Sequence, residues 1–469
     1  MKTHQSTPRQ DGNVLVICLF TCAILGFAIA SCFVYVRNQM TAAARSQSWN
    51  ESLVISEAGI EDGLMLINKY SDTTTPRGWW TNTATDDSWT RVGNAPLVFW
   101  VQRTLNGSRY DVFVTNGTQP WIRSVGTKSF SAGRAAIQRA IVVRATPGSL
   151  FQGGLIAKGG VTLQGNVLVD SFNSQLAGAN IDGKYDPSIR RDNGSIASAS
   201  SNVVATVTAG GSVQVYGKVY TGPEDGFVSN GGATIGSEAF VDGASTGIES
   251  GFVQNDLNLY VPDAPTPSTT GIPLPAKGNT VVGTNTYTSS YYLTEGSYRN
   301  VGNLQLSSSD KIVVSGNVKL EFMNDFKMSG SSQIIILPNS SLTIYARDSV
   351  DLAGGGVMNQ TGYATNLTIN GLPTCTSIKY TGSSDFVGTI YAPYAYLELS
   401  GGGSSDLHFV GSAVASSIKV SGHTQVHYDE SLLQLPSGPH YYTTLWAEIP
   451  LSTTTSSTSS TSSSSTQTF

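Results

Sequence analysis

An uncharged apolar run near the start of the chain limits its fold more than any other feature. The run "NVLVICLFTCAILGFAIASCFVYV" occupies residues 13–36 and holds no Asp, Glu, Lys or Arg. Its length matches the roughly 20 apolar residues that a membrane-spanning helix needs. A secretory signal peptide has a shorter apolar core, of about 7–15 residues, followed by a small-residue cleavage site. We therefore expect residues 13–36 to form a transmembrane helix.

The residues after this run keep a helical pattern. Apolar side chains recur at helical spacing, at Leu53, Ile60, Leu64 and Ile67. The sequence becomes polar and rich in turn residues only after Tyr70, so we expect residues 37–70 to be the exposed continuation of the same helix. At about 1.5 Å per residue, a helix over residues 13–69 would be roughly 85 Å long. The acids of this segment are expected on its solvated face: Glu57, Glu61 and Asp62.

The N-terminal residues resemble those of type IV pilin-like proteins. A short polar leader ends in Gly12, the apolar helix starts at once at Asn13, and "SEAGIEDGL" follows in the amphipathic part. More narrowly, "DGNVLVICLF" followed by "SEAGIEDGL" is similar to the N-terminal region of PilX-type pilus-assembly proteins. The resemblance implies that residues 1–12 are a cytoplasmic leader, cut by a prepilin peptidase between Gly12 and Asn13, and that the remainder is exported. Pilins usually carry Glu where this chain has Ile17, and a plain, uncleaved anchor is the alternative.

Residues 71–148 predict a small antiparallel sheet. Short aromatic and β-branched runs alternate there with Asn-Gly and Gly-Thr turns, which is typical of a meander, here of four strands. The pilin resemblance also implies a small sheet packed on the exposed half of a long helix. Four tryptophans are expected to pack in this region rather than to form a carbohydrate platform: Trp79, Trp80, Trp89 and Trp100.

The next segment predicts a stack of short strands. From about Lys311, apolar runs recur with centres about seven or eight residues apart, so that three runs make a unit of roughly 22 residues. This spacing favours a parallel β-helix, with a sandwich of 8–12 residue spacing as the alternative. We expect one β-helix-like block over residues 149–259, a proline-rich connection over 260–283 and a second block over 284–436.

The expected fold class is therefore α+β overall. It combines a long N-terminal transmembrane and stalk helix, a small antiparallel sheet and a mainly-β domain that resembles a parallel β-helix. Residues 437–450 are apolar enough to fold back as a cap on that domain, and the Ser/Thr-rich tail 451–469 is expected to be disordered.

Phrases within these blocks are similar to a C-terminal module attached to PilX-type N-termini in predicted bacterial surface proteins. They are "GNVLVDSFNS", "GKVYTGP" and the stretch from "FVGTIYAPYAYLELSGGG" to "HYDESL". The resemblance assigns no catalytic residue and no function to the module.

Charge and cysteine content exclude two classes of protein. Only 13% of the residues are charged and the formal net charge is -5, so nothing favours a nucleic-acid partner. Three cysteines lie inside the apolar run (Cys18, Cys22 and Cys32) and Cys375 stands alone, which allows no disulfide framework outside the membrane.

Scattered acids are the sharpest argument for an enzyme. Carbohydrate-cleaving β-helix enzymes need acids that converge on one solvent face. With units of roughly 22 residues, Asp325, Asp348 and Asp351 would stack on one face, although a solvated ladder of turn residues explains them equally well. The other acids of this region are Asp310, Glu321, Asp385, Glu398 and Asp406.

The stretch "GHTQVHYDES", residues 422–431, resembles a metal site but does not predict one. On a strand, at about 3.3 Å per residue, His423 and His427 lie roughly 13 Å apart, too far to share a zinc ion. Alternation instead predicts a strand with one wet, polar face and a packing face that holds Val426 and Tyr428. The polar row comprises His423, Gln425, His427 and Asp429.

These patterns predict a bacterial, pilin-like structural surface protein that is not an enzyme and has no catalytic residues, cofactor or metal. Residues 13–36 would hold it in the inner membrane as a single-pass protein with a periplasmic bulk, or it would reach the pilus or cell surface once processed and assembled. Its expected partners are the membrane, other pilin-like subunits bound through the helix, and surface glycans, in pilus-type assembly or adhesion. The alternative is a membrane-anchored β-helix that binds or cleaves carbohydrate.

Overall fold

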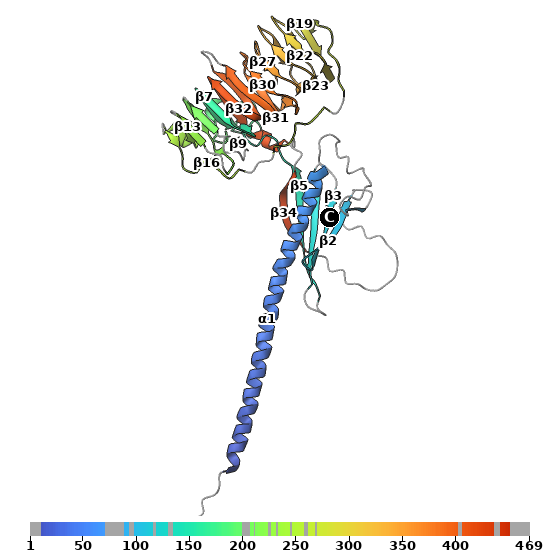
Figure 1. The fold of residues 1–469 in the computed structure, drawn as a ribbon, viewed down its shortest axis with the longest axis vertical. Coiled ribbons are helices and arrows are strands. Elements are labelled where there is room, and N and C mark those ends of the chain that lie inside the picture. The colour runs from blue at the N-terminus through green and yellow to red at the C-terminus, as the bar shows by residue number, and fades with distance from the viewer. Residues whose placement is uncertain are drawn as a thin grey trace, which may run out of the picture. The chain divides into compact units, whose positions relative to one another are not determined.

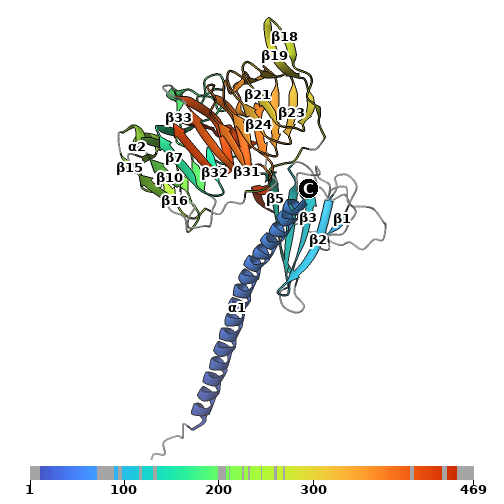
Figure 2. The same cartoon turned by 45° about the horizontal axis from the view of Figure 1, so that its top comes forward.

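The computed structural model describes residues 11–70, 89–92, 98–115, 119–129, 135–198, 207–210, 212–223, 227–230, 233–243, 246–257, 261–267, 270–401, 406–435 and 441–450. The leader up to residue 10, Trp79, Trp80 and the tail 451–469 lie outside these residues, together with the predictions made for them. The chain forms two compact units, shown in Figures 1 and 2. One comprises Met1–Lys69, Trp79–Thr146 and Tyr442–Phe469, and the other comprises Tyr70–Gly78 and Pro147–Tyr441.

A single helix of 60 residues, α1 (Asp11–Tyr70), begins the first unit. It confirms one continuous helix that ends at Tyr70. Over its apolar first half the side chains are uncovered, with Leu15 74%, Phe27 77% and Phe33 71% exposed. The helix is long and apolar enough to cross a membrane.

Antiparallel strands pack on the second half of this helix and confirm the small sheet. The sheet has the order β1-β2-β3-β4-β5-β34. Its strands are β1 (Thr90–Val92), β2 (Val98–Leu105), β3 (Ser108–Thr115), β4 (Trp121–Lys128), β5 (Ile137–Pro147) and β34 (Tyr441–Ile449). The meander β1 to β5 therefore has one short strand more than the four that the sequence predicts.

Two glycines let the helix approach this sheet closely. A Cβ atom at Gly59 would lie 2.2 Å from Oγ of Ser124, and one at Gly63 would lie 2.6 Å from Cγ2 of Ile122. Both glycines belong to "SEAGIEDGL", so the motif is explained by helix–sheet contact. Asp62 is buried there and its Oδ2 lies 2.6 Å from Nε of Arg103, so the expectation that Asp62 is solvated is wrong.

The expectation that residues 437–450 cap the β-helix-like domain is wrong for the part that the structure describes. Strand β34 instead lies beside β5 in the small sheet. Arg139 on β5 forms an ion pair with Glu448, and Oγ1 of Thr146 lies 2.9 Å from Oγ1 of Thr444. The physical reason is that β5 would otherwise present an unpaired edge. The second unit is thus inserted between two adjacent strands of the first.

The second unit contains a 23-stranded sheet built almost entirely from parallel pairs. Before the proline-rich connection its strands are β6 (Leu155–Ala157), β7 (Val161–Gly165), β8 (Val167–Phe172), β9 (Ile196–Ser198), β10 (Val207–Gly210), β11 (Val213–Tyr216), β12 (Val219–Tyr220), β13 (Phe227–Asn230), β14 (Thr234–Gly236), β15 (Gly247–Ile248) and β16 (Val253–Gln254). After it they are β17 (Ile272–Pro273), β20 (Gly296–Asn300), β21 (Leu304–Leu306), β23 (Asn317–Phe322), β24 (Phe326–Met328), β26 (Ser341–Ala346), β27 (Val350–Leu352), β29 (Leu367–Gly371), β30 (Ser377–Tyr380), β31 (Phe386–Gly401), β32 (Leu407–Gly422) and β33 (Thr424–Asp429).

Among the described residues, a five-stranded sheet and four short helices complete this unit. The sheet holds β18 (Gly278–Val282), β19 (Asn285–Leu293), β22 (Lys311–Val314), β25 (Gln333–Ile336) and β28 (Val357–Asn359). The helices are α2 (Glu238–Asp242), η2 (Pro187–Ile189), η3 (Ala364–Asn366) and η4 (Glu430–Gln434).

One buried row of side chains shows how the parallel strands are stacked. Neighbours in the row are register partners: Tyr298, Leu320, Ile344, Ile369, Ile390, Ala413, Leu155, Ile196 and Val219. All nine are buried in one apolar core. From Tyr298 to Ala413, successive members of the row are 22, 24, 25, 21 and 23 residues apart in the sequence.

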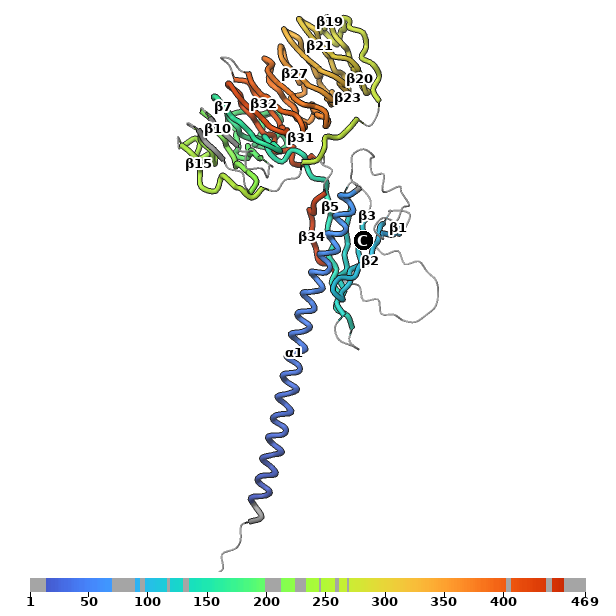
Figure 3. Tube along the Cα trace, in the orientation of Figure 1, coloured from blue at the N-terminus to red at the C-terminus, as the bar shows by residue number. Residues whose placement is uncertain are grey.

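The same row shows that the chain enters its stack in the middle. The first strands after the small sheet, β6 and β7, pair with β32, and β8 pairs with β33. Figure 3 shows β7 beside β32, with β19 at the far end. Residues 149–259 therefore extend the stack in one direction, and the proline-rich connection leads to its other end, where β17 pairs with β20. We call the contact of β6, β7 and β8 with β32 and β33 the seam.

Candidate functional site

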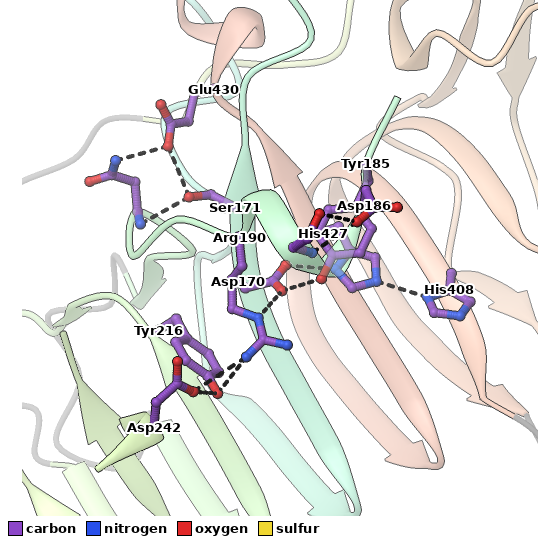
Figure 4. Close-up of polar contacts among 12 residues, drawn as sticks. Asp170, Ser171, Tyr185, Asp186, Arg190, Tyr216, Asp242, His408, His427 and Glu430 are labelled. Carbon is purple, nitrogen blue, oxygen red and sulfur yellow. Dashed lines mark hydrogen bonds and ion pairs between the residues drawn. The ribbon is translucent and has the colours of Figure 1, made fainter. Parts of the chain in front are cut away.

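A buried Asp–His pair lies at the centre of the seam. Asp170 on β8 and His427 on β33 are register partners on adjacent parallel strands, and both side chains are 0% exposed. Nδ1 of His427 lies 2.6 Å from Oδ1 of Asp170 (Figure 4). Burying a carboxylate is costly unless it is paired and hydrogen bonded, so this contact fixes the seam strands against each other.

The segment between β8 and β9, residues 173–195, lies over this pair, and we call it the strap. The hydroxyl of Tyr185 donates a hydrogen bond of 2.6 Å to Oδ2 of Asp170. Its ring stacks on His427, with 3.6 Å between the ring centroids. Nε of Arg190 lies 3.2 Å from the same Oδ2 as an ion pair, and its Nη1 donates to the hydroxyl of Tyr216 (Figure 4).

A second histidine extends the pair. Nδ1 of His408 on β32 lies 2.8 Å from Nε2 of His427. Because Nδ1 of His427 donates to the carboxylate of Asp170, its Nε2 is left to accept a hydrogen bond from Nδ1–H of His408. Burial lowers the pKa of His427, although its hydrogen bond to Asp170 and the charge of that carboxylate act in the opposite direction. His427 is therefore neutral at pH 7.

A second carboxylate ties the strap to the end of β33. Oε1 of Glu430 accepts hydrogen bonds from Oγ of Ser171, from Nε of Arg191 and from Nδ2 of Asn193, at 2.8 to 2.9 Å. Nearby, Tyr428 donates from its hydroxyl to the carbonyl of Phe151. These contacts join residues from the start and the end of the second unit, so the network closes the stack.

The structure separates the predicted polar row into two environments. His423 and Gln425 lie near Asp406, with 3.8 Å between Nδ1 of His423 and Oδ1 of Asp406. His427 and Asp429 are buried, so the expected wet face is wrong at these two positions. The reason is the strap, which covers them: the carboxylate of Asp429 accepts from the backbone N–H of Ser174.

Sequence reasoning found His427 but not its partners. Asp170 interrupts the apolar run "NVLVDSF", which is the signal that a buried charge needs a partner. Nothing in the sequence pairs it with a histidine 257 positions away. Tyr185 and Arg190 lie in the polar stretch "GKYDPSIRRD", which resembles any surface loop.

The acids weighed as catalytic residues all have structural partners. The predicted stack of Asp325, Asp348 and Asp351 is wrong, because the step here is 24 residues, from Phe326 to Val350, rather than 22. The partners of the eight acids are Lys277 for Asp310, Arg299 and Arg347 for Glu321, Ser349 for Asp325 and Asp348, Lys327 for Asp351, the backbone of His408 for Asp385, Lys379 and Lys419 for Glu398, and Gln425 for Asp406.

Five of these charges form a ladder of alternating sign across consecutive strands. Register partners in order are Lys327, Asp351, Lys379, Glu398 and Lys419. In three of these pairs, Lys327–Asp351, Lys379–Glu398 and Lys419–Glu398, the Nζ atom lies 3.8 to 4.0 Å from a carboxylate oxygen. Exposed pairs at such distances contribute about 0–1 kcal/mol each, so the ladder favours the correct register more than it stabilises the stack.

Gly12 and Asn13, the residues at the predicted cut, lie in the first turn of α1, and the structure describes their backbone alone. Within the described ranges, no three His, Cys, Asp or Glu side chains are grouped as metal ligands.

Comparison with known proteins gives one family match. The family described as "Domain of unknown function (DUF7305)" matches residues 274–435, less than half of the chain. A comparison with curated proteins finds no match. Among solved structures, the chain is similar to the competence-associated pilin ComZ from Thermus thermophilus at 8% identity, covering 86% of this chain and 98% of that one, with a TM-score of 0.19. At that TM-score the similarity supports no inference about fold or function.

Proposed function

We propose that this chain is a pilin-like structural surface protein. In this proposal residues 13–36 anchor it in the inner membrane, and the small sheet and a β-helix are held in the periplasm, or on a pilus or the cell surface after processing. The observation that carries the proposal is the division of α1 into two halves with different surfaces.

The first half of α1 has apolar side chains that nothing in the described structure covers. Leu15, Phe27 and Phe33 are among its most exposed residues. Such a surface needs lipid or the helices of other subunits around it. The second half packs on the sheet through Gly59 and Gly63, so it supports a folded unit outside the membrane.

The register of the parallel strands supports a β-helix as the displayed part. A return to one column every 21 to 25 residues, an apolar interior and short turns are properties of a solenoid. A solenoid of this kind is a rigid scaffold suited to display, adhesion or contact with surface glycans.

The acidic side chains weighed as catalytic residues are already paired with basic or polar groups, and this supports a structural rather than an enzymatic role. Carbohydrate cleavage needs carboxylates free to face a substrate. Glu321 is buried between Arg299 and Arg347, and Glu398 faces Lys379 and Lys419. A polysaccharide-cleavage screen with the full chain should find no turnover, and saturable cleavage abolished by Asp325→Asn or Asp351→Asn would overturn the structural role.

Membrane extraction tests the anchor. The full chain, produced in a bacterial host, should stay in the membrane pellet after washing with alkaline carbonate. A matched variant that lacks residues 13–36 should appear in the supernatant. Release of the full chain by carbonate would contradict the anchor and with it the proposed function.

A further inference from the structure

The strap that covers the seam is attached in a way that depends on protonation. We propose that residues 173–195 act as an acid-sensitive latch, closed while the buried ring of His427 is neutral and released when that ring takes up a proton.

The strap is held by polar contacts more than by apolar burial. Leu176 and Ile181 are 48% and 49% exposed, so two of its larger apolar side chains face solvent. Its attachments to the stack include hydrogen bonds and ion pairs to the carboxylates of Asp170, Asp429 and Glu430. They also include hydrogen bonds to uncharged groups of Ser171, Tyr216 and Ser431.

Several of these attachments have a carboxylate as acceptor. Asp170 accepts a hydrogen bond from Tyr185 and forms an ion pair with Arg190. Glu430 forms an ion pair with Arg191. Outside the seam pair, Arg190 also lies 3.5 Å from Asp242. Charge-assisted hydrogen bonds are roughly twice as strong as neutral ones. A positive charge on His427 would compete with Arg190 for the carboxylate of Asp170 and would so weaken the attachment of the strap.

The contact between the two histidines makes the closed latch sensitive to acid. Their N–H···N contact can hold one extra proton, but with two protons an N–H on each ring would face the other across 2.8 Å. The groups that face them are Asp170 from β8, and Tyr185 and Arg190 from the strap. On β33 itself, Asp429 follows His427. Arg190 already supplies a positive charge, so a second imidazolium can be accommodated only if the rings or the strap move apart.

Residues 317–346 of the stack contain no histidine. Leu320, Ile344 and Ile369 belong to a buried apolar row, and apolar contacts do not titrate. Release of the strap should therefore precede loss of the stack as the pH falls. The exposed surface would then include the outer faces of β8 and β33 around Asp170 and His427.

Hydrogen exchange of the full chain in detergent micelles tests the latch. Protection of residues 173–195 should fall between pH 7.5 and pH 5.5 after correction for intrinsic rates, while residues 317–346 stay protected. For each proton taken up on opening, the equilibrium constant for opening rises about tenfold as the pH falls by one unit. In His408→Gln the slope should fall by about one proton, because the amide oxygen of glutamine can accept from a protonated Nε2 of His427, which removes the opposed N–H groups. In His423→Gln, which removes an exposed histidine near Asp406, the slope should not change.

A second variant keeps the test informative if His408→Gln folds poorly. Tyr185→Phe removes the hydroxyl that donates to Asp170, so the strap should exchange faster at every pH in that range. The proposal is overturned if strap protection does not change with pH, if His408→Gln and His423→Gln change the slope equally, or if the stack and the strap lose protection together.

Discussion

Asp170 and His427 are separated by 257 positions in the sequence and lie opposite each other on adjacent parallel strands, with 2.6 Å between Oδ1 and Nδ1. This contact joins the first strands of the second unit to its last. The stack is consequently closed in its middle. Substitutions at the seam should therefore destabilise the second unit more than substitutions elsewhere in it.

Replacing Asp170 tests that expectation. Asp170→Asn removes the charge that Arg190 and His427 share, and breaking a buried pair typically costs about 3–5 kcal/mol. Thermal unfolding of the full chain in detergent should show a clearly lower midpoint. The matched control is Asp351→Asn on the charge ladder, where an exposed pair is worth about 0–1 kcal/mol. Equal effects of the two substitutions would mean that the seam pair has no special role.

The stability of the second unit should fall with acid in the range where histidine titrates. Burial lowers the pKa of His427 in the folded protein, so near pH 6 the unfolded chain binds more protons than the folded one. The stabilisation is complete above the unfolded pKa of about 6.5 and is lost as the pH falls below it. Unfolding midpoints measured from pH 8 to pH 5 should decrease below that value. A profile that is flat, or that rises toward acid, contradicts this environment for His427.

Cys375 should be an unreactive thiol in the native protein. It is free and buried, and burial raises its pKa to about 12. The thiol therefore stays protonated at pH 8, and only thiolates react rapidly with alkylating reagents. Iodoacetamide followed by peptide mass spectrometry should modify Cys375 only after denaturation. Because the folded pKa is raised, the thiol's contribution to stability is present at neutral pH and lost as the pH rises above about 8.5.

Adding one methyl group to Gly59 should displace the helix from the sheet. A glycine-to-alanine change inside a helix ordinarily stabilises it by roughly 0.5–1 kcal/mol. At Gly59 the new Cβ would lie 2.2 Å from Oγ of Ser124, and such overpacking costs about 1–3 kcal/mol. Gly26→Ala is the control on the same helix, since nothing lies within 4 Å of a Cβ there. Unfolding of the full chain in detergent should be easier for Gly59→Ala and unchanged or harder for Gly26→Ala, and a stabilised Gly59→Ala would refute the close contact.

Reversing one charge of the ladder should have a small effect that depends on salt. Lys379→Glu places a negative charge between Asp351 and Glu398, in a partly exposed row. The destabilisation should be about 1 kcal/mol or less and should shrink as salt shortens the screening length to below about 8 Å. Lys311→Glu is the control, because its register partners Ser290 and Gln333 are uncharged. An effect that is independent of salt would show that the ladder acts through packing and not through charge.

Local patterns were enough to predict the elements of this fold, and contacts between distant segments were not. The apolar run and the change to polar residues after Tyr70 indicated the limits of α1, and turn residues indicated the strands of the meander. The spacing from Lys311 onward predicted the repeat, because each strand there pairs with one a single turn later. The position of β34 beside β5 depends on an edge that lies about 300 residues earlier, which no local pattern reports.

The prediction of the candidate site was incomplete for a related reason. Alternation along β33 correctly separates His427 from Val426, but it cannot show that a strap from residues 173–195 covers one end of the polar row. The prediction that the acids stack failed because two extra residues in the turn before Ser341 shift the register, so that Asp351 lies opposite Lys327. A repeat length that varies from turn to turn cannot be extrapolated over several strands.

The N-terminal residue of the mature chain tests the proposed function most directly. The full chain should be produced with and without a prepilin peptidase, recovered from membranes, and analysed by N-terminal sequencing. The pilin-like account predicts a chain that begins at Asn13 when the peptidase is present, and at Met1 when it is absent or when Gly12 is changed to Leu. A chain that begins at Met1 in the presence of an active peptidase, with a known pilin processed in the same cells, would contradict it.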